Sequence, residues 1–245
     1  SNYYHKISEG DVNKVKFLLY PVIAILAPFI LVLSQPDLGT AILILLSGIV
    51  VTWLAGVRWK IFAYLTLASI VLAPIAISFL KPYQKSRILT FLNPDSDPLG
   101  AGYQIIQSKI AIGSGGLFGK GFLNGSQAYL NFLPEKHTDF IFTLYSEEFG
   151  FLGSVSMIFL YSLITYRIIV IGNKTRSIFA KLYCFGFANA FFIYVAVNMS
   201  MVLGLLPIVG APLPILSYGG SSMLAIMFGL GIVMSCNIYK NTAVG

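Results

Sequence analysis

The chain has 245 residues, of which 57% are hydrophobic and only 10% are charged, and its formal net charge is +7. Its mean hydropathy is +0.82. Because about a quarter of the residues of a soluble domain are charged, this composition excludes a soluble globular protein and predicts an all-α polytopic membrane protein.

Six apolar stretches are long enough to cross a bilayer as helices, which takes about 20 residues each. They are predicted at 17–34, 38–57, 60–80, 140–171, 179–206 and 213–237. We therefore expect one membrane domain over 1–245, with about six transmembrane helices and one large loop at about 81–139. Cys184 and Cys236 fall inside the spans and are predicted to be small buried side chains, not metal ligands.

The charged residues are divided unequally between the two predicted sides of the membrane. The side with both chain ends collects ten basic and two acidic residues, whereas the side with the large loop has six basic and seven acidic residues. Because basic loops remain in the cytoplasm, both ends are predicted to be cytoplasmic and the large loop extracytoplasmic. The positive charge is thus a topology signal and does not indicate a nucleic-acid partner.

The large loop begins with prolines, aspartates and glycines between 94 and 102, which predict turns. Apolar residues at 105, 106, 110 and 112 then predict a short helix over 103–112. This helix either lies in or re-enters the membrane interface, or simply packs beneath the loop. The pattern fits both arrangements equally.

A glycine-rich segment with one lysine, GSGGLFGKG, follows at 113–121. Such segments cradle phosphate groups with their backbone amides, so one interpretation is a lid or a contact with a lipid phosphate, and the other is a plain turn. The segment is not a nucleotide-binding P-loop. That motif needs glycine at 114 and serine or threonine at 121, where Ser114 and Gly121 stand.

Three titratable residues, Glu135, His137 and Asp139, crowd the point where the chain re-enters the membrane. Asp139 is of a type that favours the N-cap of the following helix. A carboxylate there faces the positive end of the helix dipole and is favoured in its ionised form, as a general base requires. The capping and catalytic roles of Asp139 are compatible. Glu135 and His137 either orient a substrate or are loop residues without a role in the reaction.

Further polar residues lie inside the predicted spans. On an ideal helix Glu147 is turned by about 80° from Asp139 and lies roughly 12 Å deeper, too far for a directly paired acid and base. Acidic groups at such depth line a cavity or find a basic partner. Asn198 is interpreted as a hydrogen bond between helices. The prolines at 207–214 predict an outer turn, and the small residues at 217–222 allow close packing or backbone exposed to a ligand.

Several of these motifs together resemble the signature stretches of the SEDS family (shape, elongation, division and sporulation proteins). They are QPDLGT at 35–40, the glycine-rich segment at 113–121, FLPEKHTDFIF at 132–142, PLP at 212–214 and SYGGS at 217–221. The stretch NPDSDPLGAGY at 93–103 favours the RodA-like branch of the family. The motifs occur in order along essentially the whole chain, which makes the resemblance specific.

The resemblance implies a bacterial peptidoglycan glycosyltransferase that polymerises lipid II at the outer face of the cytoplasmic membrane, for cell elongation and rod shape. It places the catalytic aspartate at Asp139, which would accept a proton from the acceptor sugar while undecaprenyl pyrophosphate leaves. Lys109 and Lys120, or a divalent cation, would stabilise the pyrophosphate. No metal ligands are predicted. The other predicted substrate contacts are Asp37, Glu135, His137, Glu147 and Ser217.

The resemblance also implies partners: lipid II, the nascent glycan, membrane lipid and a class B penicillin-binding transpeptidase. Family members usually have about ten spans, so the first four are expected to be absent here, as in a fragment or a truncated product. Two alternatives stay open. Glycine- and proline-interrupted spans with intramembrane acids also suit a transporter (flippase) of lipid-linked precursors, and a truncated copy could serve as a non-catalytic scaffold for the transpeptidase.

Overall fold

The computed structural model describes residues 15–35, 37–78, 82–97, 100–125 and 137–241. Within these ranges every regular element is a helix. The chain divides into two compact units, of which the first comprises 1–82, 166–190 and 229–245 and the second comprises 83–165 and 191–228. Three long helices therefore contribute residues to both units.

Six apolar helices occupy the predicted spans. They are α2 (Val15–Ser34), α3 (Leu38–Leu54), α4 (Trp59–Ser78), α8 (Ile141–Lys174), α9 (Ile178–Val202) and α10 (Gly220–Ile238). Of the described helices, α8, α9 and α10 are long and apolar enough to cross a membrane, and α2, α3 and α4 contain shorter apolar stretches. The membrane-protein fold is confirmed. The last helix begins at Gly220, not at 213, because residues 203–219 form a loop with three prolines.

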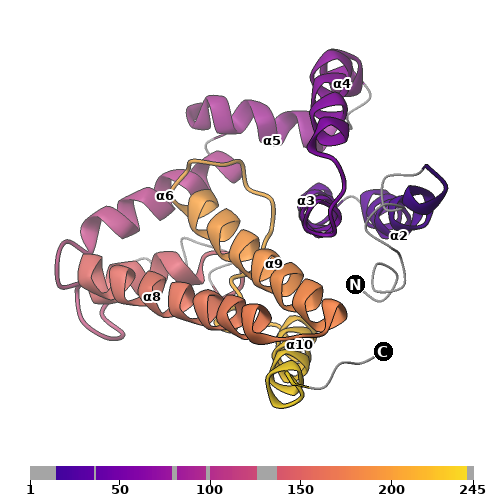
Figure 1. Ribbon diagram of the computed structural model, residues 1–245. Coiled ribbons are helices and arrows are strands. Elements are labelled where there is room, and N and C mark those ends of the chain that lie inside the picture. Colours follow the sequence, from indigo (N-terminus) through magenta and orange to yellow (C-terminus); the bar gives the residue numbers. More distant parts are fainter. Residues whose placement is uncertain (1–14, 36, 79–81, 98–99, 126–136, 242–245) are drawn as a thin grey trace. The chain divides into compact units, whose positions relative to one another are not determined.

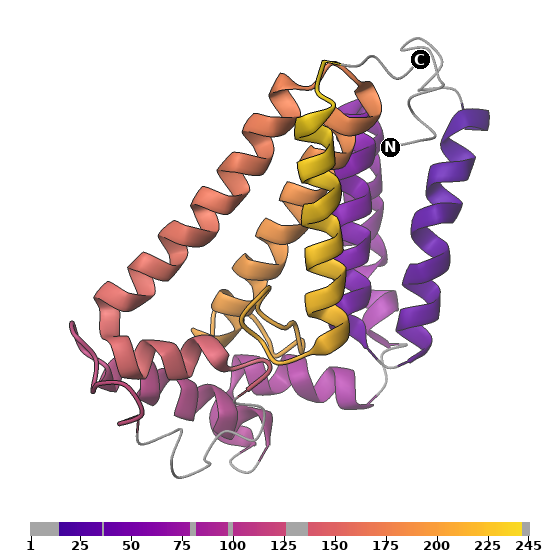
Figure 2. The ribbon, with the colours of Figure 1, turned by 90° about the horizontal axis from the view of Figure 1, so that it is seen from below.

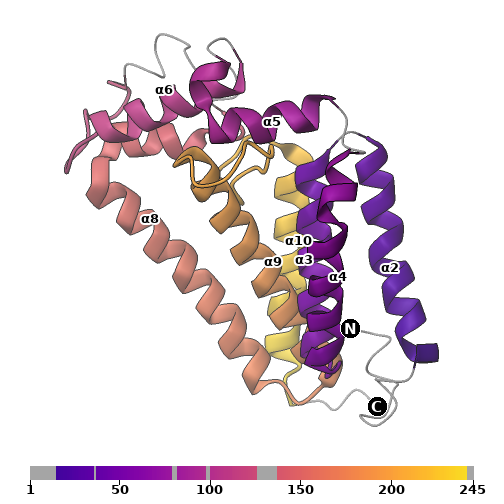
Figure 3. The same cartoon turned by 90° about the horizontal axis from the view of Figure 1, so that it is seen from above.

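In the first unit, glycines let helices approach closely. A Cβ atom on Gly48 of α3 would lie 2.6 Å from the Ile25 side chain of α2, and these two helices lie side by side in Figures 1 and 3. Glycines at helix contacts are typical of membrane proteins, in which packing replaces the hydrophobic effect between helices. Cys184 and Cys236 are both buried free thiols, as predicted.

The second unit contains the predicted large loop, which is more helical than expected. The short 3-10 helix η1 (Pro94–Ser96) lies where turns were predicted, but α5 (Pro82–Leu92), which precedes it, was not predicted. Its sequence is short and polar, so no apolar periodicity marks it. The helix predicted at 103–112 is confirmed as α6 (Ala101–Ser114), which starts where the Asp97 carboxylate accepts a hydrogen bond from the Ala101 backbone amide.

The core of the second unit joins α6, α8 and α9. One face of α6, with Ile105 and Ser108, is buried, so this helix packs within the unit. The Ser108 hydroxyl lies 2.7 Å from both the Thr143 hydroxyl of α8 and the Val202 carbonyl at the end of α9. Around this polar contact lie large buried side chains, which are Phe140, Phe142, Met157, Tyr161, Phe191, Met199, Met201, Ile208 and Leu213.

Helix α8 is broken near its start. Gly150 has φ 67° and ψ −160°, a conformation outside the helical region, and Figure 2 shows the sharp change of direction that follows. The predicted fourth span was long because polar residues precede its apolar part. The break separates these two parts into a first segment at 141–149 and a long apolar segment after Gly150.

Candidate functional site

Asp139 lies in the turn that leads into α8, in the second unit. Its side chain is half-buried. A Cβ atom built on Gly210 would lie 3.5 Å from its carboxylate oxygen Oδ2, and Gly210 has φ +71°, which favours glycine. The carboxylate therefore packs against the loop that follows α9, at Gly210, which has no side chain.

The backbone around Asp139 is held by three hydrogen bonds on consecutive carbonyls. The Tyr218 backbone amide donates to the His137 carbonyl over 2.9 Å. The Ser217 hydroxyl donates to the Thr138 carbonyl over 2.6 Å, and the Asn198 side-chain amide donates to the Asp139 carbonyl over 2.8 Å. We call the carbonyls of 137–139 and these three donors the carbonyl frame. It fixes the turn to α9 and to the loop before α10.

Ser217 serves the frame with both functions of its hydroxyl. Besides donating to the Thr138 carbonyl, Oγ accepts a hydrogen bond of 2.6 Å from the Leu213 backbone amide, and the residue is 5% exposed. Nearby, Ile215 has φ +72°, a strained conformation for a β-branched residue that is characteristic of functional sites. This strained backbone conformation cannot be predicted from the sequence. The predicted substrate contact of Ser217 stays a prediction.

Asn198 is fully buried at 0% exposure. Its Nδ2 group donates to the Asp139 carbonyl and, over 2.6 Å, to the Ala211 carbonyl. The interpretation of Asn198 as a link between helices was therefore wrong, since both acceptors belong to loops. The apolar sequence around Asn198 indicates only that a polar group is buried, not which backbone it binds.

His137 is exposed and lines a cavity of about 650 Å³ beside the frame. The other lining residues are Ile141, Ile215, Leu216, Ser217, Tyr218, Gly219, Gly220 and Met223. Mostly apolar walls with a few polar groups are typical of binding pockets. The structure thus brings two predicted site residues, His137 and Ser217, to one cavity next to Asp139.

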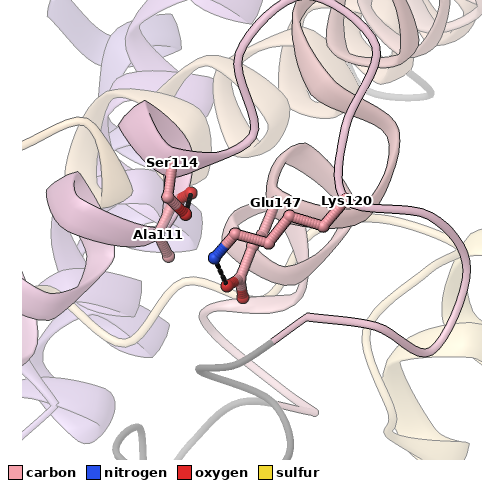
Figure 4. Close-up of polar contacts among 4 residues, drawn as sticks. All are labelled: Ala111, Ser114, Lys120 and Glu147. Atoms are coloured by element: carbon pink, nitrogen blue, oxygen red, sulfur yellow. Dashed lines mark hydrogen bonds and ion pairs between the residues drawn. The ribbon is translucent and has the colours of Figure 1, made fainter.

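Glu147 and Lys120 form an ion pair, with Nζ and Oε1 2.7 Å apart. Figure 4 shows the lysine reaching from the glycine-rich segment to the glutamate on α8. The side chain of Glu147 is 0% exposed and that of Lys120 is 30% exposed. Of the two expectations for an acid inside a span, that it lines a cavity or finds a basic partner, the ion pair agrees with the second. The pair is internal, and the predicted contacts of both residues with substrate stay predictions.

The glycine-rich segment closes the break in α8. We call residues 115–121 the glycine loop. The Lys120 and Gly121 amides donate to the carbonyls of Glu147 and Glu148, each over 3.0 Å. In return, the amides of 151 and 152 donate to the carbonyls of 116 and 117. An unbroken helix would have joined 151 to 147 and 152 to 148. The loop therefore replaces both missing helical bonds with four of its own.

This arrangement favours the plain turn among the interpretations of the glycine-rich segment. The amides of 115, 116, 119, 120 and 121 all donate to backbone carbonyls, so they do not form a phosphate cradle. The glycines are needed for close contact instead. A Cβ atom on Gly119 would lie 2.0 Å from the Glu148 carbonyl oxygen. The segment is a structural turn that fits the broken helix.

The remaining predicted site residues belong to elements other than the frame or lie outside the described chain. Lys109 is exposed on α6, with its side chain lying across Gly204. Asp37 belongs to the first unit, where its carboxylate caps α3 by accepting a 3.0 Å hydrogen bond from the Thr40 amide. Glu135 lies outside the described residues.

The donor set was also tested for a divalent cation. Within the part of the chain that the structure describes, no three His, Cys, Asp or Glu side chains come together as metal ligands. The described residues therefore do not fit a metal site built by the protein alone.

The sequence pattern of the cell cycle protein family that includes FtsW, RodA and SpoVE matches residues 1–242. The chain belongs to this family. The expected family membership is thereby confirmed, and it accounts for the order of motifs along the whole chain.

Curated relatives within the FtsW/RodA/SpoVE family include two bacterial proteins of known name. The peptidoglycan glycosyltransferase MrdB of Escherichia coli (strain K12) is 47% identical over 220 residues, which are 89% of this chain and 60% of MrdB. Stage V sporulation protein E of Bacillus subtilis (strain 168) is 37% identical over 237 residues, 96% of this chain and 64% of that protein. The chain thus spans about 60% of the length of the curated relatives it matches.

Solved structures of the family share the fold. A chain of a peptidoglycan synthase complex, studied for the coordination of polymerization and crosslinking, is 33% identical and superposes with a TM-score of 0.81 over 98% of this chain and 67% of that chain. The rod shape determining protein RodA of Thermus thermophilus is 26% identical, with a TM-score of 0.63 over 97% of this chain and 60% of RodA.

Proposed function

We propose that this chain carries the reaction centre of a peptidoglycan glycosyltransferase that polymerises lipid II. The observation that carries the proposal is the 47% identity to the glycosyltransferase MrdB over 89% of the chain. The carbonyl frame supports it, because a base must be held in a fixed position before the substrate arrives. Asp139 is the residue whose backbone the frame holds.

In the proposed reaction, the Asp139 carboxylate accepts the proton of an acceptor sugar hydroxyl. The hydroxyl oxygen then forms a bond to the anomeric carbon of a second lipid-linked sugar. The bond from that carbon to the pyrophosphate oxygen breaks, and its electron pair leaves with undecaprenyl pyrophosphate. The cavity beside His137 and Tyr218 is the proposed place for one of the two sugars.

The proposed setting is the cytoplasmic membrane of a bacterium, with both chain ends in the cytoplasm and the carbonyl frame at the outer face. The distribution of basic residues supports this orientation. A class B penicillin-binding transpeptidase is the proposed partner, since a structure similar to this chain comes from a complex that coordinates polymerization and crosslinking.

The test is reconstitution in liposomes with purified lipid II and the transpeptidase partner. The chain is assayed both as it stands and grafted into the matching segment of E. coli MrdB, and the same two proteins are made with Asp139→Asn. We expect glycan polymer from at least one Asp139 protein and none from its Asp139→Asn counterpart at equal amounts of folded protein.

Each other outcome has a distinct meaning. Polymer from the Asp139→Asn proteins would remove Asp139 as the base. Movement of lipid II across the bilayer without polymer would favour the transporter. Binding of the partner without polymer in either setting would favour the scaffold.

A further inference from the structure

The Asp139 backbone depends on one side chain from a distant part of the sequence. Asn198 lies 59 positions away, on α9, and is fully buried. Its amide nitrogen is the donor to both the Asp139 and the Ala211 carbonyls. Because only the NH₂ end of the amide can donate to two carbonyls, these acceptors fix the orientation of the side chain.

The two acceptors belong to the two segments that meet at the Asp139 side chain. The Asp139 carbonyl leads into α8, and Ala211 directly follows Gly210, the residue against which the Asp139 carboxylate packs. Asn198 therefore ties the backbone that bears the carboxylate to the backbone that supports it. A change in either bond would alter the distance between the carboxylate and its support.

The Asn198 side chain is retained at a cost to its own hydrogen bonding. Its Oδ1 atom is buried and has no hydrogen-bond partner among the described residues, and an unsatisfied buried acceptor is destabilising. An apolar residue would avoid that cost but would lose both donors. The side chain thus keeps both donors although its own acceptor stays unsatisfied, and the two donors, not the unsatisfied atom, distinguish Asn198 from its neighbours.

We propose that Asn198 is a positioning residue. It holds the catalytic base in place through the backbone of Asp139 and does not act through the substrate. The proposal rests on the proposed function. It predicts that loss of the two donors lowers the rate of the chemical step and leaves substrate affinity unchanged, because the base is displaced while the cavity walls remain.

The test compares Asn198→Leu with Asn189→Leu in the liposome assay, in whichever setting of the chain makes polymer. Asn189 is a matched control, because it lies on the same helix and its side-chain nitrogen has no hydrogen-bond partner among the described residues. We expect Asn198→Leu to lower the maximum rate per folded molecule on the order of 100-fold. The lipid II concentration for half the maximum rate should stay within about twofold, and Asn189→Leu should keep both values.

Three results would overturn the proposal. They are an unchanged maximum rate, a rise in the half-saturating lipid II concentration at unchanged maximum rate, and a loss of rate that only follows the loss of folded protein. If Asn198→Leu does not fold, Asn198→Ser takes its place, because it adds no bulk and its single hydroxyl hydrogen cannot donate to both carbonyls. Its maximum rate per folded molecule should also fall, by less than that of Asn198→Leu, at an unchanged half-saturating lipid II concentration, and an unchanged maximum rate would overturn the proposal. Polymer made by the Asp139→Asn variant would instead refute the role of Asp139. If Asp139→Asn makes no polymer and Asn198→Leu is fully active, only the role of Asn198 is refuted.

Discussion

The first segment of α8 is held in two different ways at its two ends. At its start, the carbonyl frame uses side-chain donors, Asn198 and Ser217, together with one backbone amide. At its end, the glycine loop uses backbone hydrogen bonds and glycines packed against the α8 backbone, together with the one ion pair of the Lys120 side chain with Glu147. A side chain in the frame can be removed without adding atoms, whereas a Cβ atom on Gly115 or Gly119 of the loop would lie 2.2 Å or 2.0 Å from a carbonyl oxygen of α8. Substitutions of frame side chains can therefore be assayed for rate per folded molecule, whereas substitutions of these two glycines act on folding itself.

The largest effect is expected for Gly150→Ala, at the break in α8. Its φ of 67° and ψ of −160° form a conformation that almost only glycine adopts, and an added Cβ would lie 2.3 Å from the Gly119 backbone nitrogen. Strain and overpacking together should lower the free energy of unfolding by more than about 3 kcal/mol. The measurement is the unfolding midpoint in detergent micelles, or the loss of folded protein.

Gly113→Ala is the matched control for this substitution. Gly113 lies in the same glycine-rich segment but inside α6, and an added Cβ would meet no atom within 4 Å. Alanine is the better helix former, so this variant should be as stable as the parent or more so. Equal losses from both substitutions would contradict the role assigned to the α8 break.

A smaller loss is expected for Lys120→Met, which leaves the buried Glu147 without its ion-pair partner. Removal of one partner of a buried pair costs about 3 kcal/mol, at the low end of the usual range because Lys120 is 30% exposed. Adding Glu147→Met should restore most of this stability, because replacing both charges by apolar groups is nearly neutral. Lys60→Met, at an exposed lysine of the first unit, is the control. A double variant as unstable as Lys120→Met would argue against the pair.

The same contrast shows how far the sequence predicts the structure. Apolar length located all six apolar helices, because crossing a bilayer constrains composition directly. For Glu147, the sequence left two possibilities open, a cavity wall or a basic partner. The identity of the partner came from the fold, since Lys120 and Glu147 are 27 positions apart. The glycine-rich segment was ambiguous because glycine serves both ligand binding and close packing, and only the neighbouring helix decides between these roles.

The carbonyl frame was the least predictable part of the site. Asp139, His137 and Ser217 were named from type and motif, and the first two lie in one turn. Asn198 was recognised as a buried polar residue, but its acceptors are backbone carbonyls, which every residue has and no sequence pattern marks. The strained Ile215 likewise has no local signal. Side-chain contacts to backbone therefore require the structure, whereas charged and apolar patterns can be read from the sequence.

The smallest effect is expected for Ser217→Ala, which tests the second side-chain donor of the frame. It removes the bond to the Thr138 carbonyl and leaves the Leu213 amide unsatisfied, so the free energy of unfolding should fall by about 2 kcal/mol. Because Asn198 and the Tyr218 amide still hold the turn, the rate per folded molecule should fall by less than about tenfold, well short of the effect of Asn198→Leu. Ser222→Ala is the matched control, since that hydroxyl bonds only to the nearby Gly219 carbonyl, three positions away. If the two serine variants lose equal stability, the Ser217 hydroxyl does not hold the frame, and Asn198 would then be its principal side-chain support.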